Sequence, residues 1–351
     1  MDTLTHALSG ALLARATAPR ASGAGDLSPR ARLAAGFLSC AFPDLDFVIG
    51  VAGPVEYLLH HRGVTHSVLL APLWALLIAW LLSKLARDAR GWKPWFGVCV
   101  LGLYAHIAGD VITSFGTMVL APLSDWRAAL GTTFIIDLWF TGIIIAGLAA
   151  SYFWPRARLP AVAATMLLVG YVSMQVVLKH EAERFGRDYV AAQRLPDASV
   201  EAQPRPVSPF NWTVFVSDAR THRYAHINLL RDDARTPGPD DGLIARLDAA
   251  YRPPRDAYWE SRPRYGFDAE TEALARDAWR SPALAFFRWF ADKPAFDGIT
   301  PGSTCVWFVD LRFDSPGRAW VPFRFGACRD APGAPWRAYR RIGDAGRVAL
   351  D

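Results

Sequence analysis

Residues 61–86 read HRGVTHSVLLAPLWALLIAWLLSKLA, and this stretch indicates both where the chain lies and where its chemistry lies. The first seven residues, HRGVTHS, contain two histidines, an arginine and a glycine. They lead into an apolar run over 66–86, which matches the ~20 residues that a helix needs to cross a bilayer. Side chains of the types that bind ligands are unexpected at the end of a membrane helix unless a ligand binds there.

The composition of the whole chain supports a membrane protein. Its 351 residues are 52% hydrophobic and 20% charged, and the mean hydropathy of +0.13 is unusual for a soluble protein. Residues 1–16 predict a helix that crosses the bilayer only in part. Five further segments are each about as long as the ~20 residues that a membrane helix needs: 31–52, 66–86, 95–113, 133–154 and 159–178. The predicted fold is a mainly α membrane domain over 1–180, with five or six membrane helices, followed by an α+β soluble domain over 181–351.

Basic residues in the loops predict the orientation of this membrane domain. Arginines and lysines gather in the segments 15–32, 84–93 and 156–158, which the positive-inside rule places in the cytoplasm. The C-terminal domain then lies in the periplasm, if the chain sits in a bacterial inner membrane. Because most of the net charge of +5 lies in these loops, it does not indicate a nucleic-acid partner. The expected partner is the lipid bilayer.

The C-terminal region predicts strands from alternating and β-branched sequence, such as NWTVFVSD at 211–218 and STCVWFVDLRF at 303–313. Residues 269–291 predict a helix broken near Pro282. A periplasmic location also favours a disulfide between Cys305 and Cys328, because that compartment is oxidising, with two unpaired core cysteines as the alternative.

Candidate ligands come from four or five segments, and the predicted topology brings them to one side of the membrane. A single histidine or acid at a helix end has ordinary explanations, such as hydrogen bonding or contact with the interface. As a set they need compensation, because an acid at a helix centre costs roughly 2.5–3.5 kcal/mol on insertion. One arginine cannot neutralise four carboxylates, whereas metal ions can. The residues are His6, Asp44, Asp46, His61, Arg62, His66, His106, Asp110 and Asp137.

Their spacing favours a metal site. His106 and Asp110 are four residues apart and share one helical face. Asp44 and Asp46 would diverge on a regular helix, but Pro43 directly before them predicts a break. Nitrogen and carboxylate ligands suit Zn²⁺ first, with Mn²⁺ or Fe²⁺ as alternatives, and the number of ligands allows one or two ions.

Four motifs in order resemble a known family: THALSG at 5–10, FPDLD at 42–46, HRGVTHS at 61–67 and HIAGD at 106–110. The sequence resembles the YdjM-like bacterial inner-membrane proteins, which are described as metal-dependent hydrolases. The order of these residues is also similar to zinc-dependent phospholipase C. That likeness implies His6, Asp44, His66, His106 and Asp110 as metal ligands. The chain departs from the phospholipase pattern by lacking the later histidine and glutamate ligands, which puts a third metal in doubt.

The first functional hypothesis is a membrane-bound metal-dependent hydrolase that cleaves a phosphoester or lipid-linked substrate at the outer face of the membrane. A metal would polarise the substrate oxygen and lower the pKa of a water toward ~7. Arg62 is the predicted phosphate clamp. His61 is either a further ligand or an acid near the leaving group, while Asp46 or Asp137 serves as general base or as support for a ligand.

Two alternatives belong to other classes. A cation transporter would need polar residues along the whole depth of the helices, whereas runs such as LWALLIAWLL at 73–82 carry none. A non-catalytic membrane sensor or scaffold would hold the metal in a closed site. An open coordination position would separate the hydrolase from the scaffold.

Overall fold

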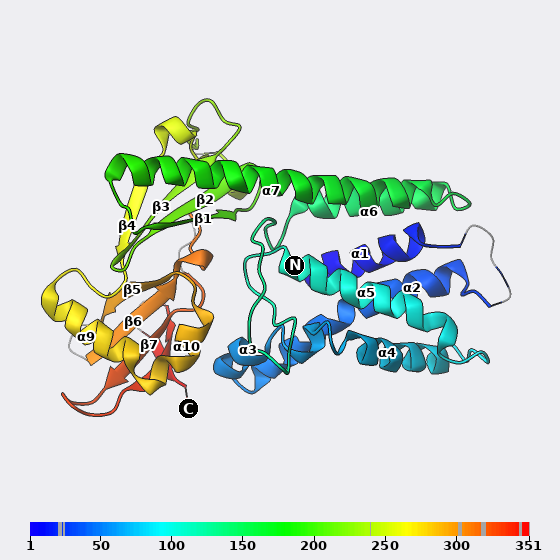
Figure 1. Cartoon of the computed structure of the whole chain (residues 1–351), viewed down its shortest axis with the longest axis horizontal. Helices are drawn as coiled ribbons and strands as arrows, with labels where there is room; N and C mark the ends of the chain where they lie inside the picture. Colours follow the sequence, from blue (N-terminus) through cyan, green and yellow to red (C-terminus); the bar gives the residue numbers. More distant parts are fainter. Residues whose placement is uncertain are drawn as a thin grey trace. The chain divides into compact units, whose positions relative to one another are not determined.

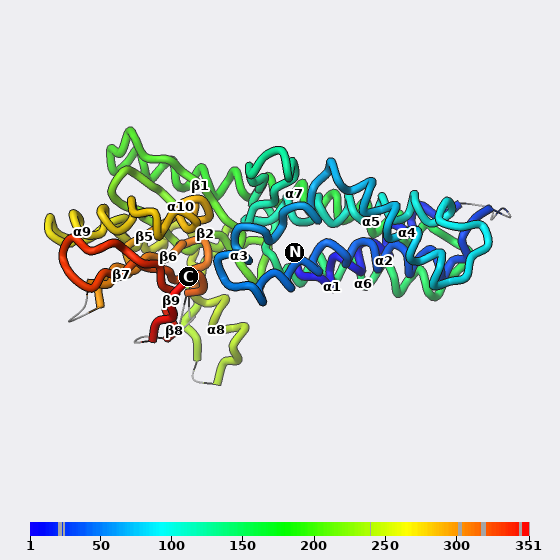
Figure 2. Tube along the Cα trace, turned by 90° about the horizontal axis from the view of Figure 1, so that it is seen from below, coloured from blue at the N-terminus to red at the C-terminus, as the bar shows by residue number. Residues whose placement is uncertain are grey.

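The computed structural model describes residues 1–19, 23, 25–238, 240–300, 304–316, 321–343 and 346–350. Within them the chain forms two compact units. Unit 1 comprises Met1–Ile49 and His60–Val177, and unit 2 comprises Gly50–Leu59 and Leu178–Asp351. A helical N-terminal region is thus followed by a region rich in β-sheet, as the sequence predicts. Figures 1 and 2 follow the chain from two directions.

Unit 1 is built from helices that pack along one another. Its elements are α1 (Thr3–Ala16), α2 (Pro29–Ala41), η1 (Phe42–Val51), η2 (Val64–His66), α4 (Ala71–Leu85), α5 (Lys93–Val111), α6 (Leu138–Phe153) and the first half of α7 (Leu159–Gln193). Helices α1, α2 and α5 pack against one another, and α4 packs on α5 (Figure 1). The segment between α5 and α6 returns across the ends of these helices through backbone hydrogen bonds such as Met118 N to Arg62 O, 2.9 Å.

The structure does not confirm the number of membrane helices predicted from the sequence. In the part of the chain that the structure describes, three helical segments are long and apolar enough to cross a bilayer, namely Pro29–Val51, Lys93–Val111 and Leu159–Gln193. A fourth arises if Pro54–His66 and Ala71–Leu85, bent by 77°, count as one broken span. Helix α6 is only 16 residues long, because residues 133–137 are not helical and Asp137 caps its start. The predicted count of five or six spans is therefore not confirmed.

Glycines allow α1, α2 and α5 to approach closely. A Cβ atom on Gly10 would lie 2.1 Å from the Gly36 carbonyl oxygen, and one on Gly36 would lie 2.4 Å from the Gly10 oxygen. A Cβ atom on Gly102 would lie 2.1 Å from Ser39 Oγ. Small residues at such crossings let membrane helices pack backbone to backbone. This packing places the start of α1, the end of α2 and the end of α5 within side-chain reach of one another.

Unit 2 contains two antiparallel sheets. The first has the order β1-β2-β3-β4, formed by Ser199–Pro204, Asn211–Ser217, Thr221–Asn228 and Trp259–Pro263. The second has the order β5-β6-β7-β8-β9, formed by Pro294–Ile299, Thr304–Asp310, Phe325–Arg329, Arg337–Ile342 and Gly346–Ala349. The end of α7 packs on the first sheet, with Ala182 against the buried Trp212 and Val214. Strands β2 and β6 confirm the predicted strands over 211–217 and 304–310. Residues 311–313 instead form the 3-10 helix η5, and residue 303 of the predicted strand lies outside the described residues.

Short helices accompany the sheets of unit 2: α3 (Pro54–His60), α8 (Leu243–Ala249), η3 (Pro254–Asp256), α9 (Ala269–Arg280), η4 (Pro282–Leu284), α10 (Ala285–Phe290) and η5 (Leu311–Phe313). The predicted break near Pro282 is confirmed, because η4 separates α9 from α10. Trp279 of α9 contacts Phe308 of the second sheet, with ring centroids 4.8 Å apart. Cys305 and Cys328 face each other in β6 and β7 and form the predicted disulfide.

Candidate metal centre

Four ligand-type side chains meet inside unit 1. Asp44 comes from η1, His66 from η2, and His106 and Asp110 from α5. One donor atom from each lies within 4.8 Å of the donor atoms of the other three. His66, His106 and Asp110 are completely buried, whereas the side chain of Asp44 keeps 10% of its surface exposed. The cluster is thus assembled from residues 66 positions apart, and Asp44 is its most accessible member.

The distances within the cluster fit one tetrahedral ion. In a tetrahedral site with metal–ligand bonds of about 2.0–2.2 Å, the ligand atoms lie about 3.3–3.6 Å from one another. His66 Nε2 and His106 Nε2 are 3.0 Å apart, and Asp110 Oδ2 lies 3.2 Å and 3.5 Å from them. Asp44 Oδ1 lies 3.8 Å from the His66 nitrogen and 3.6 Å from that of His106. The donors therefore already have nearly the separation that a bound Zn²⁺ requires.

A backbone carbonyl orients the ring of His106. The Nδ1 atom of His106 donates to the Cys40 carbonyl oxygen at 2.6 Å, which leaves the lone pair of Nε2 directed at the cluster. This carbonyl lies where α2 changes into the 3-10 helix η1 at Phe42. In a 3-10 pattern the donor to it would be residue 43, which is a proline without an N–H. The predicted break at Pro43 therefore makes the Cys40 carbonyl available to His106, and this hydrogen bond orients the His106 ring.

Asp46 orients the HRGVTHS loop instead of joining the cluster. Its Oδ2 atom accepts from the backbone N–H of Arg62 at 2.9 Å and from Thr65 Oγ1 at 3.2 Å. Its Oδ1 atom accepts from His61 Nδ1 at 2.7 Å. His66 Nδ1 lies 2.9 Å from Thr65 Oγ1 and 3.4 Å from the Asp46 carboxylate. Asp46 thus holds His61 directly and holds His66 through Thr65, as an outer carboxylate commonly does for a metal-bound histidine.

The positions of the two central imidazoles are compatible with a cation between them. In the tautomers in which His66 Nδ1 donates to Thr65 Oγ1 and His106 Nδ1 donates to the Cys40 carbonyl, two unprotonated Nε2 atoms face each other across 3.0 Å. Two facing lone pairs repel each other. The Oδ2 atoms of Asp44 and Asp110 also lie buried without a hydrogen-bond donor. Unsatisfied buried acceptors of this kind are rare and costly, and this donor set fits a divalent metal ion.

Arg62 lies inside the site, not at its mouth. Only 2% of the residue is exposed, and its Nη2 atom pairs with Asp110 Oδ1 at 2.8 Å while Nη1 donates to Thr113 Oγ1 at 3.1 Å. Its backbone has φ +61°, so Arg62 and not Gly63 provides the left-handed turn of the loop. Gly63 is needed for space instead, because a Cβ atom there would lie 2.7 Å from the His60 carbonyl oxygen. Arg62 therefore balances one carboxylate of the cluster.

His6 reaches the cluster through Asp110. Its Nε2 atom donates to Asp110 Oδ1 at 3.0 Å, and its ring stacks on that of His106 at 3.8 Å between centroids. The α-amino group of Met1 also donates to Asp110 Oδ1. Gly109, next to Asp110, leaves space for the His6 ring, because a Cβ atom there would lie 3.0 Å from His6 Cε1. His6, Cys40 and His106 form a second group of potential ligands, although His6 Nε2 already donates to a carboxylate and His106 Nδ1 to a carbonyl.

Asp137 has a different environment. Its Oδ1 atom caps α6 by accepting from the backbone N–H groups of Trp139 and Phe140, both at 2.9 Å. Its Oδ2 atom accepts from the Tyr171 hydroxyl at 2.8 Å. These contacts account for both oxygens of the buried carboxylate without a metal. The structure therefore brings eight of the nine candidate residues together and gives Asp137 a capping role.

Three contributors to the site were not among the candidates from sequence. Thr65 links His66 to Asp46, Thr113 holds Arg62, and the Cys40 carbonyl orients His106. Thr113 follows Asp110 by three residues, a spacing that sequence alone contains, although α5 ends at Val111 and Thr113 lies just beyond it. For the Cys40 carbonyl the sequence signal was indirect: Pro43, three residues later, lacks the N–H that would bond this oxygen in a 3-10 helix.

Comparison with known proteins assigns the family. The model of the YdjM inner membrane protein family matches residues 1–182, which contain the whole cluster. The chain belongs to the YdjM inner membrane protein family. It is 28% identical over 188 residues to the uncharacterized protein YfhP of Bacillus subtilis (strain 168), a match that covers 52% of this chain and 56% of the relative. The chain thus aligns with little more than half of that relative's length. No solved structure matches the chain significantly.

Proposed function

We propose that the chain is a membrane-bound metal-dependent hydrolase that cleaves a phosphoester or lipid-linked substrate. The observation that carries the proposal is the buried pair of histidine nitrogens 3.0 Å apart, with two carboxylates beside them at near-tetrahedral separation. His66, His106, Asp110 and Asp44 would hold one divalent ion. The mixed nitrogen and oxygen donors favour Zn²⁺, with Mn²⁺ or Fe²⁺ as alternatives. When bound, the metal would supply a Lewis acid for the substrate oxygen.

The residues around the cluster support a hydrolytic role. His61 keeps 11% of its side chain exposed, and Asp46 accepts from its Nδ1 atom at 2.7 Å. This contact selects the tautomer whose Nε2 atom accepts a proton, as a general base requires. Asp44 is the exposed edge of the cluster, so substrate would approach on its side. Arg62 would keep Asp110 ionised and in place, because the pair is buried.

The proposal is tested by measuring bound metal and hydrolysis on the same samples. Full-length protein in detergent would be analysed by metal mass spectrometry and assayed with a chromogenic phosphodiester and with phospholipids. Asp110→Asn should lose metal and hydrolysis together, and the exposed neighbour His60→Ala should retain both. His61→Gln should retain metal and lose most hydrolysis. Metal-free wild-type protein, or full metal occupancy in Asp110→Asn, would contradict the proposal.

A closed structural metal site is the second candidate function. Four protein donors can fill a tetrahedral ion completely, as in structural zinc sites, and three of the four residues here are fully buried. The two candidates differ at Asp44, the ligand farthest from the two histidine nitrogens. In a catalytic site, Asp44→Asn should change hydrolysis more than metal content. In a structural site, metal-loaded wild-type protein should hydrolyse none of the substrates.

We further propose that unit 2 faces the periplasm, because the basic segments 15–32, 84–93 and 156–158 favour the cytoplasm. A reporter fused after Gln193, where α7 ends, tests this orientation. Alkaline phosphatase should be active there and a green fluorescent reporter dark. A fluorescent fusion without phosphatase activity would reverse the orientation and place the opening of the cluster toward the cytoplasm.

A further inference from the structure

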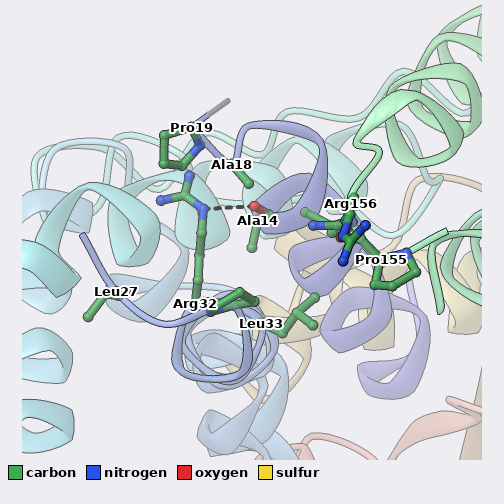
Figure 3. Close-up of a pocket in the computed structure, with 10 residues that line it drawn as sticks. Ala14, Ala18, Pro19, Leu27, Arg32, Leu33, Pro155 and Arg156 are labelled. Carbon is green, nitrogen blue, oxygen red and sulfur yellow. Dashed lines mark hydrogen bonds between the residues drawn. The ribbon is translucent and has the colours of Figure 1, made fainter. Parts of the chain in front are cut away.

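A second, chemically different cavity lies in unit 1 at the other end of α1. It measures about 400 Å³ and is lined by three arginines from three separate segments. Arg15 comes from the last turn of α1, Arg32 from the first turn of α2, and Arg156 from the turn between α6 and α7. Figure 3 shows Arg32 and Arg156 on either side of Ala14. His6 and Arg15 are nine residues apart on α1, so the cavity lies about 14 Å along the helix from the metal centre.

Two of these arginines are held in position by helix ends. Arg32 Nε donates to the Ala14 carbonyl at 2.8 Å, and its Nη2 atom donates to Thr17 O at 3.1 Å and Thr17 Oγ1 at 2.9 Å. Arg15 Nη2 donates to the Pro155 carbonyl and, at 2.9 Å, to that of Ala157. These bonds fix both guanidinium groups but engage only part of their donors, because each group has five N–H bonds.

Capping of helix ends does not account for the third arginine. Arg156 is exposed at the cavity, and within the described residues it has no hydrogen bond or ion pair. No Asp or Glu is among the described residues that line the cavity, and Asp26 acts on Arg32 electrostatically from outside this lining. The remaining lining is small or apolar and includes Leu27, Leu33 and Pro155. Three positive charges thus lie beside an apolar wall, and the one nearby carboxylate acts on Arg32.

We propose that this cavity binds a phosphate group, either on the headgroup of an anionic lipid or as a free anion. Guanidinium groups bind phosphate oxygens with paired, charge-assisted hydrogen bonds. The N-terminus of α2, where Pro29 lines the cavity, adds a favourable dipole. Basic pockets between membrane helices are suited to anionic headgroups, and the apolar wall suits the glycerol and upper acyl carbons of a lipid. The proposal is independent of the hydrolase, because it uses none of the residues of the metal centre.

The decisive variant is Arg156→Gln, because within the described residues this side chain has no hydrogen bond or ion pair that the substitution would break. Arg87→Gln is the matched control, since Arg87 is an exposed arginine in another basic loop and does not line the cavity. Delipidated full-length protein in neutral detergent would be titrated by calorimetry with dihexanoyl phosphatidylglycerol, dihexanoyl phosphatidylcholine and inorganic phosphate. A parallel circular dichroism spectrum of each variant checks that it is folded.

We expect phosphatidylglycerol to bind and Arg156→Gln to weaken it about fivefold, the effect of one basic residue at an anionic membrane surface. Arg87→Gln should bind as the wild type does. Binding of phosphatidylglycerol but not of phosphate identifies a lipid site, and equal binding of both identifies a site for the phosphate group alone. Equal weakening by Arg156→Gln and Arg87→Gln, or no effect of Arg156→Gln, would overturn the proposal. Zwitterionic phosphatidylcholine binding as tightly as phosphatidylglycerol would also overturn it.

Arg32→Gln supplies a second, stricter test. This variant removes bonds to the end of α1 as well as a charge at the cavity, so it should lower both the melting temperature and the affinity. The double variant Arg32→Gln/Arg156→Gln should bind phosphatidylglycerol about 25-fold more weakly than the wild type if the two charges act independently. If the affinity for phosphatidylglycerol across these variants follows their melting temperatures and not the number of arginines that remain, the result would contradict a binding site.

Discussion

Units 1 and 2 both bury ionisable side chains, but they balance them differently. In unit 2 each buried acid has its own cation: Asp310 pairs with Arg312 at 2.7 Å, and Asp248 pairs with Arg231 at 2.5 Å. In unit 1 the carboxylates of Asp44, Asp46 and Asp110 are buried around one cluster, and the guanidinium of Arg62 and the α-amino group of Met1 both pair with Asp110. In unit 2 the pairing compensates the buried charges of both acids. The excess of acid in unit 1 calls for a cation that the side chains do not supply.

The buried histidines of the two units show the same contrast. In β3, His222 contacts Ser217 Oγ at 2.7 Å and the Pro294 carbonyl at 3.0 Å, and His226 contacts Thr213 Oγ1 at 2.8 Å. Each ring has its own partners, and neither belongs to a group of potential metal ligands within the described residues. In unit 1, His66 and His106 instead direct nitrogens at each other. Burial of a histidine does not by itself indicate a metal ligand, whereas the convergence of several donor atoms does.

The largest effect should come from removing the convergent histidines. His66→Ala/His106→Ala should abolish stoichiometric metal binding, because two of the four donors are lost. The matched pair His222→Ala/His226→Ala should retain full metal content. Metal mass spectrometry of the two purified proteins makes the comparison, and metal loss from the β3 pair would erase the distinction between the units.

Different treatments should destabilise the two units. Cys305→Ala/Cys328→Ala should lower the free energy of unfolding of unit 2 by about 3 kcal/mol, the chain-entropy value for a loop of this length. A chelator should instead increase hydrogen exchange in peptides from α5 and the 61–67 loop. Hydrogen exchange with mass spectrometry follows both units in one sample. An effect of the cysteine variant on α5, or of the chelator on β6 and β7, would show that the units are not stabilised separately.

Acid should destabilise unit 2 through its histidines. Burial lowers the pKa of His222 to about 4 and that of His226 to about 3. Since the unfolded residues bind protons near pH 6.5 and the folded ones do not, the free energy of unfolding falls as pH drops below about 6.5. The loss should be about 2 kcal/mol for each histidine at pH 5. Urea-dependent proteolysis of unit 2 at pH 7 and pH 5 measures it, and His222→Gln/His226→Gln should flatten the pH dependence.

The smallest effect separates a supporting carboxylate from a ligand. Asp46→Asn should weaken metal binding about tenfold without abolishing it, because Asp46 acts through His66 and Thr65. Asp137→Asn is the control, since this buried acid caps α6 and contacts Tyr171. Its metal affinity should equal that of the wild type. Complete metal loss in Asp46→Asn would make Asp46 a direct ligand, and metal loss in Asp137→Asn would connect it to the cluster.

Much of the candidate site could be predicted from sequence, because local spacing carries the information. His106 and Asp110 lie on the same face of a helix regardless of how that helix packs. Pro43 likewise interrupts a helix regardless of its surroundings. The number of membrane spans was less predictable, because hydropathy reports apolar content and not where a helix begins. Asp137 illustrates this limit, since it caps α6 four residues inside the predicted span.

From the sequence alone it follows that a membrane region with acids and histidines precedes a β-rich region, and that those residues are of the types that bind metals. Their individual roles follow from the packing of the folded chain. It placed Arg62 against Asp110, Asp46 behind His66, and the Cys40 carbonyl against His106. A metal ligand and a residue that supports it differ in position by only a few ångströms, and in which lone pair faces the centre of the cluster. Those quantities depend on how α1, α2 and α5 pack at their glycines, which no single segment of the sequence specifies.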